Sequence, residues 1–434
     1  MKISKKLIFA LVIFLIVSII ICYNLNPFRG STVAINNSLE LSAVLTKKQA
    51  LEDIDYVEKI IKERHVSTVD GLSPEVASSI ENEKEKINDN VTVLEIWQAA
   101  SRILSKINDA HSSVKLVSSK DKTANVNFKM YNNDLYILDD SNNKKLVFKI
   151  NNKDTNMLFE EFKTKFSFEN EYFAKNTFTA YLKSYNGISY ILNEIPDDTI
   201  DIETVSDKNK SKIEIEQIKY EEHYDNTYDN INDEIDYSID YEKSCGVLVI
   251  NSCVMNSKYK VALKNFFSAL KDNHIRNIAI DLRNNSGGNS AVIDEFMRYI
   301  DLDKYNAFTS EVRYGPYKFD VSGKRKNKKY NEFLYNGNIY VLSSNRTFSS
   351  AMMFSVTLQD NSIAKVIGEP SGNSPCSYGD VINFSLPNSK LLLIISYKKF
   401  IRPNSELSSE NYQRVDYGID EEKALDKFYE IISN

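Results

Sequence analysis

Residues 278–300 read IAIDLRNNSGGNSAVIDEFMRYI, and this stretch decides the fold class. Its first five residues are apolar except for one aspartate, which is the pattern of a buried β-strand. Two adjacent glycines, Gly287 and Gly288, follow in a turn, and residues 290–300 then have the spacing of a helix. Strand, glycine turn and helix in this order predict one unit of an α/β domain.

The same alternation continues on both sides of this stretch. Further strands are predicted at 247–250, 338–342 and 365–368, and further helices at 259–273 and 350–360. Because strands that alternate with helices pair in parallel, we expect a mixed, mostly parallel sheet with flanking helices. The pattern predicts an α/β domain over 241–434.

The chain upstream of this domain has three different patterns. Residues 46–118 have apolar positions at three- and four-residue steps, which predicts a helical subdomain. Residues 119–240 hold short apolar runs separated by Asn-Asn and Asp-Asp pairs, which predicts a β-rich middle region. Residues 24–45 lack periodicity and are interpreted as a linker, so the whole chain is of the α+β type.

The N-terminus has the pattern of a segment that directs a chain to a membrane. Three lysines, Lys2, Lys5 and Lys6, precede 16 uncharged, mainly apolar residues, Leu7 to Cys22. We interpret residues 1–23 as an uncleaved signal anchor, a single transmembrane helix at the cell membrane with the rest of the chain on the extracytoplasmic side. The alternative is a cleaved signal and a secreted protein, but isoleucines stand where a cleavage site needs small residues.

Composition excludes several classes of protein. With 54 basic and 60 acidic residues the formal charge is 54 − 60 = −6, and nucleic-acid binders normally show a basic footprint instead. Four scattered cysteines and four separated histidines predict neither a disulfide scaffold nor a metal site. Residues 221–242 are acidic without a calcium-loop motif, and we interpret them as a solvated segment. The oligomeric state cannot be predicted from the sequence.

Two strand-to-helix junctions could carry chemistry. The glycine turn can aim backbone N–H groups at an anion or oxyanion. The second junction, Asn345-Arg-Thr-Phe-Ser-Ser-Ala351, can place a serine at the carboxyl end of the sheet, although Thr347 or Ser349 could instead merely cap the helix. A serine nucleophile also needs a base. His111, in Asn-Asp-Ala-His-Ser-Ser, follows the last N-terminal helix, where a histidine can equally be a C-cap or a surface residue.

In this order the motifs resemble those of the tail-specific, or C-terminal processing, serine peptidases. The likeness is greatest to the branch with the tricorn protease core and the interphotoreceptor retinoid-binding modules. The motifs that carry the resemblance are Asp281–Gly288, Thr347–Ala351, Asp360–Gly372, Tyr378–Gly379, Leu386–Ser389 and Asp109–Ser112. The resemblance implies a ClpP/crotonase-like fold, with 241–434 as the peptidase domain.

The resemblance also implies roles for individual residues. Ser349 is the expected nucleophile, and the N–H of Ser350 with that of Gly287 or Gly288 is expected to hold the oxyanion. Where the processing branch has a lysine base this chain has Ser374, which favours a histidine base, His111.

Further side chains are expected to support this site. A carboxylate after Arg402-Pro403, either Glu410 or Glu406, would orient the imidazole, and Ser112 could support it. Together these roles predict a membrane-anchored serine peptidase that cleaves extracytoplasmic polypeptides by a Ser-His mechanism without a metal or organic cofactor. The alternative is an inactive module of the same fold that binds a peptide or an apolar ligand.

Overall fold

The computed structural model describes residues 5–34, 36–119, 121–138, 144–205, 213–222 and 234–433. The chain divides into two compact units, and neither is continuous in sequence. Unit 1 comprises residues 1–119, 311–321 and 378–399, and unit 2 comprises residues 120–310, 322–377 and 400–434. Unit 1 thus contains two segments of the predicted C-terminal domain, and the predicted domain boundaries stay predictions.

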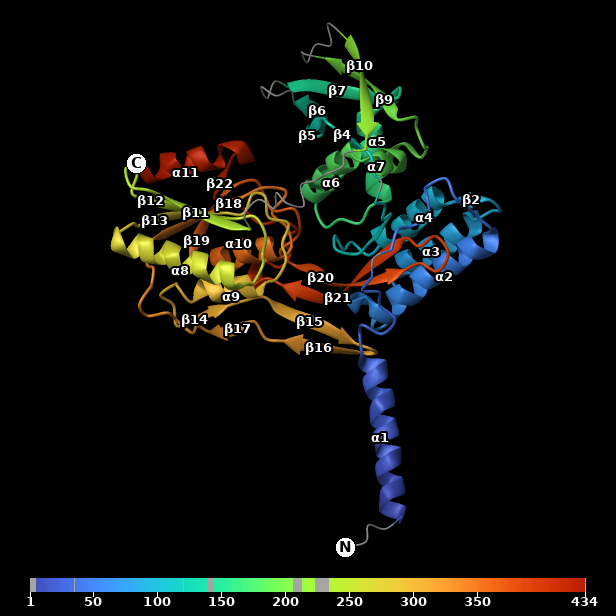
Figure 1. The fold of residues 1–434 in the computed structure, drawn as a ribbon, viewed down its shortest axis with the longest axis horizontal. Helices are drawn as coiled ribbons and strands as arrows, with labels where there is room; N and C mark the ends of the chain where they lie inside the picture. Colours follow the sequence, from blue (N-terminus) through green and yellow to red (C-terminus); the bar gives the residue numbers. More distant parts are fainter. Residues whose placement is uncertain are drawn as a thin grey trace. The chain divides into compact units, whose positions relative to one another are not determined.

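The α/β part of unit 2 is built on a six-stranded sheet (Figure 1). In spatial order its strands are β11 (Ile235–Asp240), β12 (Cys245–Ile250), β13 (Asn277–Asp281), β18 (Asn338–Ser343), β19 (Ala364–Gly368) and β22 (Tyr417–Gly418). Only the pair β11–β12 is antiparallel, and the other neighbours run parallel. The prediction of a mixed, mostly parallel sheet is confirmed.

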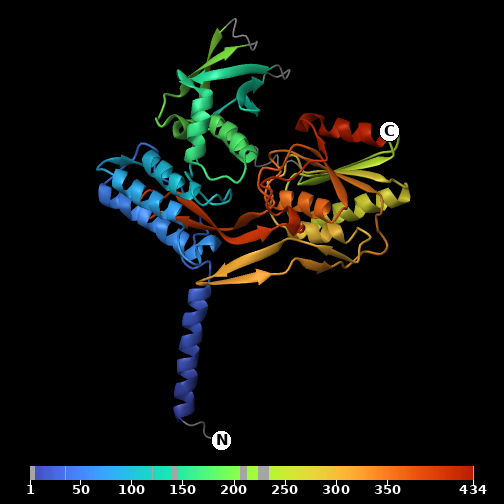
Figure 2. The ribbon, with the colours of Figure 1, turned by 180° about the vertical axis from the view of Figure 1, so that it is seen from behind.

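Helices cover both faces of this sheet (Figure 2). One face packs against α8 (Ser257–Asp272), α9 (Ala291–Met297) and α10 (Ser350–Asp360), and the other packs against α11 (Ala424–Ser433). Side chains alternate along β13, so that Ile278 and Ile280 join the first core and Ala279 joins the second. The helices predicted at 259–273 and 350–360 are confirmed, whereas α9 is shorter than the predicted 290–300. A separate ladder pairs β14 (Lys304–Asn306) with β17 (Lys324–Lys326).

The middle region of unit 2 contains a second sheet. Its strands are β4 (Thr123–Ala124), β5 (Asn127–Tyr131), β6 (Asp134–Leu138), β7 (Lys144–Ile150), β8 (Lys153–Asp154), β9 (Thr199–Val205) and β10 (Ile213–Glu221). The prediction of strands here is confirmed, but three helices were missed: α5 (Thr155–Thr164), α6 (Glu171–Lys183) and α7 (Tyr185–Leu192). Most of the acidic segment, residues 223–233, lies outside the described residues.

Unit 1 contains the helices predicted in the N-terminal subdomain. They are α2 (Lys47–Arg64), α3 (Pro74–Lys86) and α4 (Val93–Ser105), with the single turn η1 (Val66–Thr68) after α2. Ser73 caps α3 as predicted, since its hydroxyl accepts a hydrogen bond from the N–H of Val76. Thr46 and Thr92 form capping boxes at α2 and α4.

A sheet from distant parts of the chain completes unit 1. Its order is β16 (Tyr317–Val321), β15 (Thr309–Tyr314), β21 (Leu392–Ile401) and β20 (Ser377–Ser385), and β3 (Ser113–Lys115) also pairs with β21. A short ladder joins β1 (Val44–Leu45) to β2 (Val91–Thr92). Because β3 directly follows the turn at His111, this pairing fixes that turn against strands almost 300 residues later.

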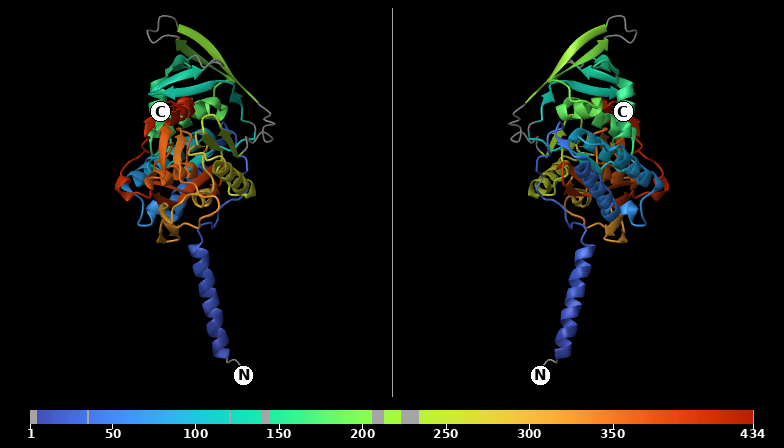
Figure 3. Two further views of the ribbon diagram at one scale, coloured as in Figure 1. Left: turned by 90° about the vertical axis from the view of Figure 1, so that its left-hand side faces the viewer. Right: turned by 90° about the vertical axis from the view of Figure 1, so that its right-hand side faces the viewer.

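The N-terminal helix α1 (Lys5–Leu25) is a straight helix in Figure 3. Among the described residues, no helix combines the length and the apolarity that a membrane crossing requires. The predicted signal anchor therefore lacks support from the structure.

Candidate active site

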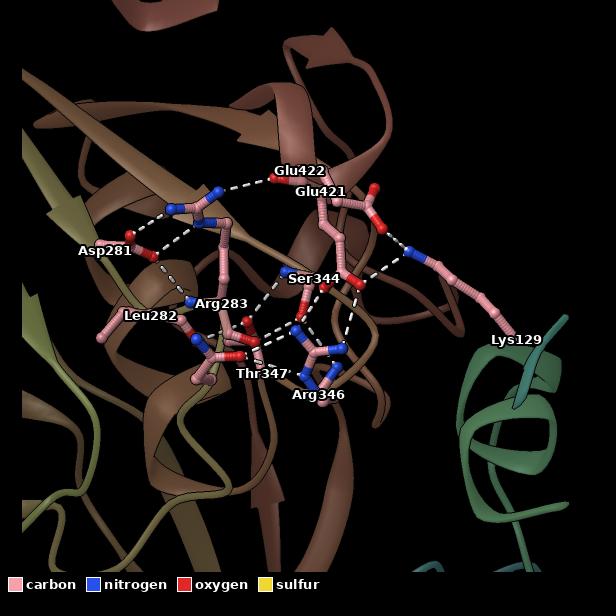
Figure 4. Close-up of polar contacts among 10 residues, drawn as sticks. Lys129, Asp281, Leu282, Arg283, Ser344, Arg346, Thr347, Glu421 and Glu422 are labelled. Carbon is pink, nitrogen blue, oxygen red and sulfur yellow. Dashed lines mark hydrogen bonds and ion pairs between the residues drawn. The ribbon is translucent and has the colours of Figure 1, made fainter. Parts of the chain in front are cut away.

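The two loops that follow β13 and β18 are tied together at the carboxyl ends of these strands (Figure 4). The Thr347 hydroxyl donates a hydrogen bond to the carbonyl of Leu282 at 2.8 Å, and the Ser344 hydroxyl donates to the carbonyl of Arg283 at 2.5 Å. Thr347 also accepts a hydrogen bond from the N–H of Ser344. The two junctions singled out in the sequence therefore form one rigid structure.

Ser349 stands at the sharp turn between β18 and α10. Its backbone has φ 53° and ψ −124°, a conformation that costs a residue with a side chain about 1–3 kcal/mol. Its N–H donates a hydrogen bond to Oδ1 of Asn373 at 2.8 Å, which holds the turn in place. Ser349 is the N-cap residue of α10 but makes no side-chain capping hydrogen bond, so the alternative that Ser349 or Thr347 merely caps the helix with its hydroxyl is wrong. This geometry is typical of a nucleophile elbow, which exposes a serine oxygen above the sheet.

Backbone N–H groups beside Ser349 can hold an oxyanion. The N–H of Gly287 is occupied, because it donates to Oδ1 of Asn285 at 2.8 Å. The N–H groups of Gly288 and Ser350 have no hydrogen-bond partner within the described residues of unit 2. The Ser350 hydroxyl donates to the carbonyl of Gly288 at 2.8 Å, which keeps the two residues together. Of the two glycines left open by the sequence, Gly288 is therefore the available donor.

The loop after β19 supports the turn at Ser349 between β18 and α10, which we call the nucleophile turn after the role predicted for Ser349. The N–H of Gly372 donates to the carbonyl of Thr347 at 2.9 Å. Asn373 accepts the Ser349 N–H and donates from Nδ2 to the Ser377 hydroxyl at 3.2 Å. Ser374, named from the sequence, is the next residue and is buried. Asn373 itself was not predicted, because its role depends on the fold bringing two loops together.

The middle region also contacts the nucleophile turn. The ring of Phe173 stacks on that of Phe348, with centroids 4.6 Å apart and planes 19° apart. A carboxylate oxygen of Glu169 accepts a hydrogen bond from the N–H of Ser374 at 2.9 Å. Phe173 lies in the first turn of α6, a helix that was not predicted from the sequence, and Glu169 lies two residues before that helix. The middle region therefore forms part of the wall of the site.

A charged network lies beside the nucleophile loop in unit 2 (Figure 4). Lys129 of β5 pairs with Glu421 at 2.9 Å and also with Glu422. Arg346, three residues before Ser349, pairs with Glu421 at 2.8 Å. Arg283 donates to the backbone carbonyl of Glu421 at 2.7 Å. Because of these contacts, the Lys129 amine has a raised pKa despite its partial burial.

The network borders a polar cavity of about 380 Å³. Its other lining residues come from β5, α6 and both site loops, and they include Asn127, Lys175, Asn176, Thr179, Asn284, Asn345 and Glu369. Burial raises the pKa of the Glu369 carboxyl, and the nearby charge of Glu421 adds to the effect. Burial lowers the pKa of the Lys175 amine. The cavity is thus lined mainly by polar and charged side chains, among them Asn345 and Arg346 of the loop that leads to Ser349.

The predicted base, His111, lies in unit 1. Its side chain is 12% exposed, and the C-cap of α4 is Lys106 rather than His111. The N–H of His111 donates to Oδ1 of Asp109 at 2.8 Å, and its Nδ1 is 4.0 Å from the same oxygen. Burial lowers the pKa of His111, whereas the charges of Asp109 and Asp380 raise it.

Asp109 is a fully buried carboxylate that lies in one of the quoted motifs but had no predicted role. Its Oδ2 lies 3.2 Å from Nε2 of His65 and accepts a hydrogen bond from the Ser112 hydroxyl. Burial would raise the pKa of Asp109, but the hydrogen bonds from His65 and Ser112 and the nearby imidazoles of His65 and His111 lower it to about 2. Asp109 is therefore charged at neutral pH. His65 was missed, because its contact with Asp109 joins residues 44 positions apart.

The two carboxylates predicted to orient His111 lie in unit 2. Glu410 pairs with Arg402 at 3.7 Å and with Arg414, and Arg402 also pairs with Asp360 at 2.7 Å. Glu406 is exposed in the single turn η3 (Ser405–Leu407). Their roles toward His111 stay predictions.

Comparison with known proteins agrees with this geometry. Residues 244–417 match the description of peptidase family S41. Among solved structures, mature CPAF is similar with a TM-score of 0.68 and 12% identity, covering 89% of this chain and 96% of that chain. The photosystem II D1 C-terminal processing protease has a TM-score of 0.50 and 10% identity, covering 89% of this chain and 97% of that chain. No curated protein matches this chain.

At these low identities, the structural similarity shows the fold, and the matched residues 244–417 show the family of that part of the chain. The expected resemblance to the tail-specific peptidases is confirmed. The narrower likeness to the tricorn-core branch stays a prediction.

Proposed function

Since the chain contains a peptidase family S41 domain and is a serine-type peptidase, we propose that it cleaves polypeptides with Ser349 as nucleophile and His111 as base. The observation that carries this proposal is the turn at Ser349. Ser349 is a strained serine between a strand and a helix. Beside it, the N–H groups of Gly288 and Ser350 donate no hydrogen bond to any described residue of unit 2. Strain of this kind persists only where the surrounding structure supports it, and it gathers at functional sites.

The proposed reaction uses groups that this chain supplies. His111 takes the proton of the Ser349 hydroxyl as its oxygen attacks the peptide carbonyl. The N–H groups of Gly288 and Ser350 hold the developing oxyanion, which is worth about 3 kcal/mol for each donor. His111 then protonates the leaving amine, and water releases the acyl group from Ser349.

Labelling of the full-length chain with a fluorophosphonate probe tests the nucleophile and the base. We expect wild type to label at Ser349, and Ser349→Ala and His111→Ala to lose the label. Ser286→Ala, an exposed serine of the glycine turn, and His274→Ala, an exposed histidine, are the matched controls and should label like wild type. Absence of label in folded wild-type protein would favour the inactive binding module instead.

We further propose that the substrates are extracytoplasmic polypeptides. Lysines followed by an apolar run are typical of a segment that directs a chain out of the cytoplasm. An alkaline phosphatase fused to the C-terminus is active only outside the cytoplasm, so an active fusion supports the proposal and an inactive but intact fusion contradicts it. Fractionation of the same cells then separates a membrane-bound form from a secreted one.

A further inference from the structure

We propose that a buried network of His65, Asp109 and Ser112 positions His111 as the base, an inference that rests on the proposed function. All four residues belong to unit 1. Asp109 is the centre of the network, because each of the other three residues is bound to its carboxylate. Asp109 thereby holds the backbone of the turn that carries His111, whereas the orientation of the imidazole by Glu410 or Glu406 stays a prediction.

The two oxygens of Asp109 have different partners. Oδ1 accepts the N–H of His111 at 2.8 Å and lies 4.0 Å from Nδ1 of the same residue. Oδ2 accepts the Ser112 hydroxyl and lies 3.2 Å from Nε2 of His65. Oδ1 therefore holds the backbone of His111, and Oδ2 is held by the Ser112 hydroxyl and the His65 ring. A fully buried carboxylate needs such donors, because burial of a charge without them is costly.

The surroundings of His65 determine how it can bind Asp109. The N–H of Ser67 donates to Nδ1 of His65 at 3.3 Å, so this nitrogen is an acceptor. Nε2 then carries the ring proton and donates it to Asp109. The carbonyl of His65 accepts from Arg313 at 2.6 Å, and its ring packs against Tyr378 with centroids 4.8 Å apart. The ring is therefore fixed as a buried donor.

Ser112 connects the network to the sheet of unit 1. Its hydroxyl donates to Asp109 and accepts the N–H of Ser396 in β21 at 3.0 Å. The N–H of Ser112 also donates to the carbonyl of Asp109 at 3.2 Å. The turn from 109 to 112 is thus closed on itself and bound to a strand. Rotation of the His111 backbone would break several of these contacts together.

The charge of Asp109 faces the imidazole that must accept a proton. Asp380, a carboxylate that also raises the pKa of His111, has its own cation, because it pairs with Lys398. A fixed negative charge near Nδ1 stabilises the imidazolium that forms when His111 takes a proton. Removal of that charge lowers the pKa of His111, because less negative charge then opposes the lowering of this pKa by burial. On a plot of labelling rate against pH, the fall in rate at low pH (the acid limb) should therefore move to lower pH.

Labelling rates of the full-length chain between pH 5 and 9 test this proposal. We expect Asp109→Asn to label about 100-fold more slowly than wild type, with its acid limb at lower pH. His65→Phe removes the donor and should slow labelling about tenfold, whereas His65→Gln keeps an amide donor and should recover most of the rate. His274→Gln, the same change at an exposed histidine, should leave the rate unchanged. Emission of the only tryptophan, Trp97 in unit 1, verifies folding.

The outcomes separate this proposal from the proposed function. If wild type labels but Asp109→Asn keeps its rate and its acid limb, the network is overturned and the function stands. The same conclusion follows if Glu410→Gln moves the acid limb and Asp109→Asn does not. If Asp109→Asn fails to fold, Ser112→Ala and the two His65 variants supply the test, and equal rates for His65→Phe and His65→Gln contradict the proposal. Absence of label in wild type contradicts the function itself.

Discussion

Gly287 lies directly against Ser349, so that a Cβ atom at position 287 would stand only 2.7 Å from the Cβ of Ser349. Gly287 also has φ +107°, which favours glycine. The glycine turn and the nucleophile turn therefore lie so close together that no side chain fits at position 287. This close approach and the hydrogen bond from the Ser350 hydroxyl to the carbonyl of Gly288 hold the two turns together.

Replacement of Gly287 by alanine should abolish activity. The added methyl group must displace Ser349, so we expect labelling by the fluorophosphonate to fall at least 100-fold. Gly71→Ala is the matched control, because Gly71 has φ +114° and a methyl group added there would meet nothing within 4 Å. Both variants should lose about 1–3 kcal/mol of unfolding free energy from strain. Equal labelling of the two variants would show that the contact with Ser349 is unimportant.

Asn373→Ala should weaken the site without removing any group proposed to react. The Ser349 N–H would lose its acceptor, which costs about 1–3 kcal/mol for a buried donor. We expect labelling to slow by about tenfold or more as the turn relaxes from its strained conformation. Asn373→Asp retains an acceptor and should lose less. A rate equal to that of wild type in Asn373→Ala would mean that the α10 and β18 ends hold the turn unaided.

Lys129→Met should loosen the middle region from the α/β part of unit 2. The Lys129 side chain is 18% exposed and joins Glu421 and Glu422, so its loss should cost about 2 kcal/mol. Lys145→Met is the matched control, because Lys145 also joins two glutamates but is 39% exposed. We expect it to cost less than about 1 kcal/mol. Urea unfolding followed by circular dichroism measures both, and equal losses would contradict the role of burial.

The buried carboxylate of Asp109 should make unit 1 sensitive to acid. Its pKa falls from 3.8 to about 2 on folding, so the charged form contributes about 2 kcal/mol of stability above pH 4. This contribution is lost as the pH falls from about 4 towards 2. Urea unfolding followed by Trp97 emission should therefore show wild type losing its advantage over Asp109→Asn between about pH 4 and pH 2. A constant difference between the two proteins would contradict this origin.

The sequence pattern was sufficient to predict the sheet of the α/β domain and its helices, because strands such as 278–282 are apolar except for one aspartate and their turns hold glycines. The same pattern predicted that Ser349, Ser350 and the two glycines lie close together, since all four follow the ends of strands. The helices α5 to α7 were missed, although Phe159, Phe162 and Phe178 are buried at helical spacing. Short apolar runs alone do not separate a strand from a buried helix.

The supporting residues could not be predicted for a different reason. Asn373, His65 and Asp109 act through contacts between segments that are far apart in the chain. Each is a polar residue of a common type, and nothing in its neighbours specifies a distant partner. Their roles become visible only when the fold places donor and acceptor within hydrogen-bond distance.

The hydrogen bond from the N–H of Ser396 to the Ser112 hydroxyl can form only late in synthesis, because the two residues are 284 positions apart. At a synthesis rate of about 5–20 residues per second, roughly 15 to 60 s pass between the two residues. During that interval the turn with His111 lacks the strand that holds it. A newly made chain therefore carries His111 long before the contact that holds its turn can form, so the proposed Ser-His site is completed only near the end of synthesis.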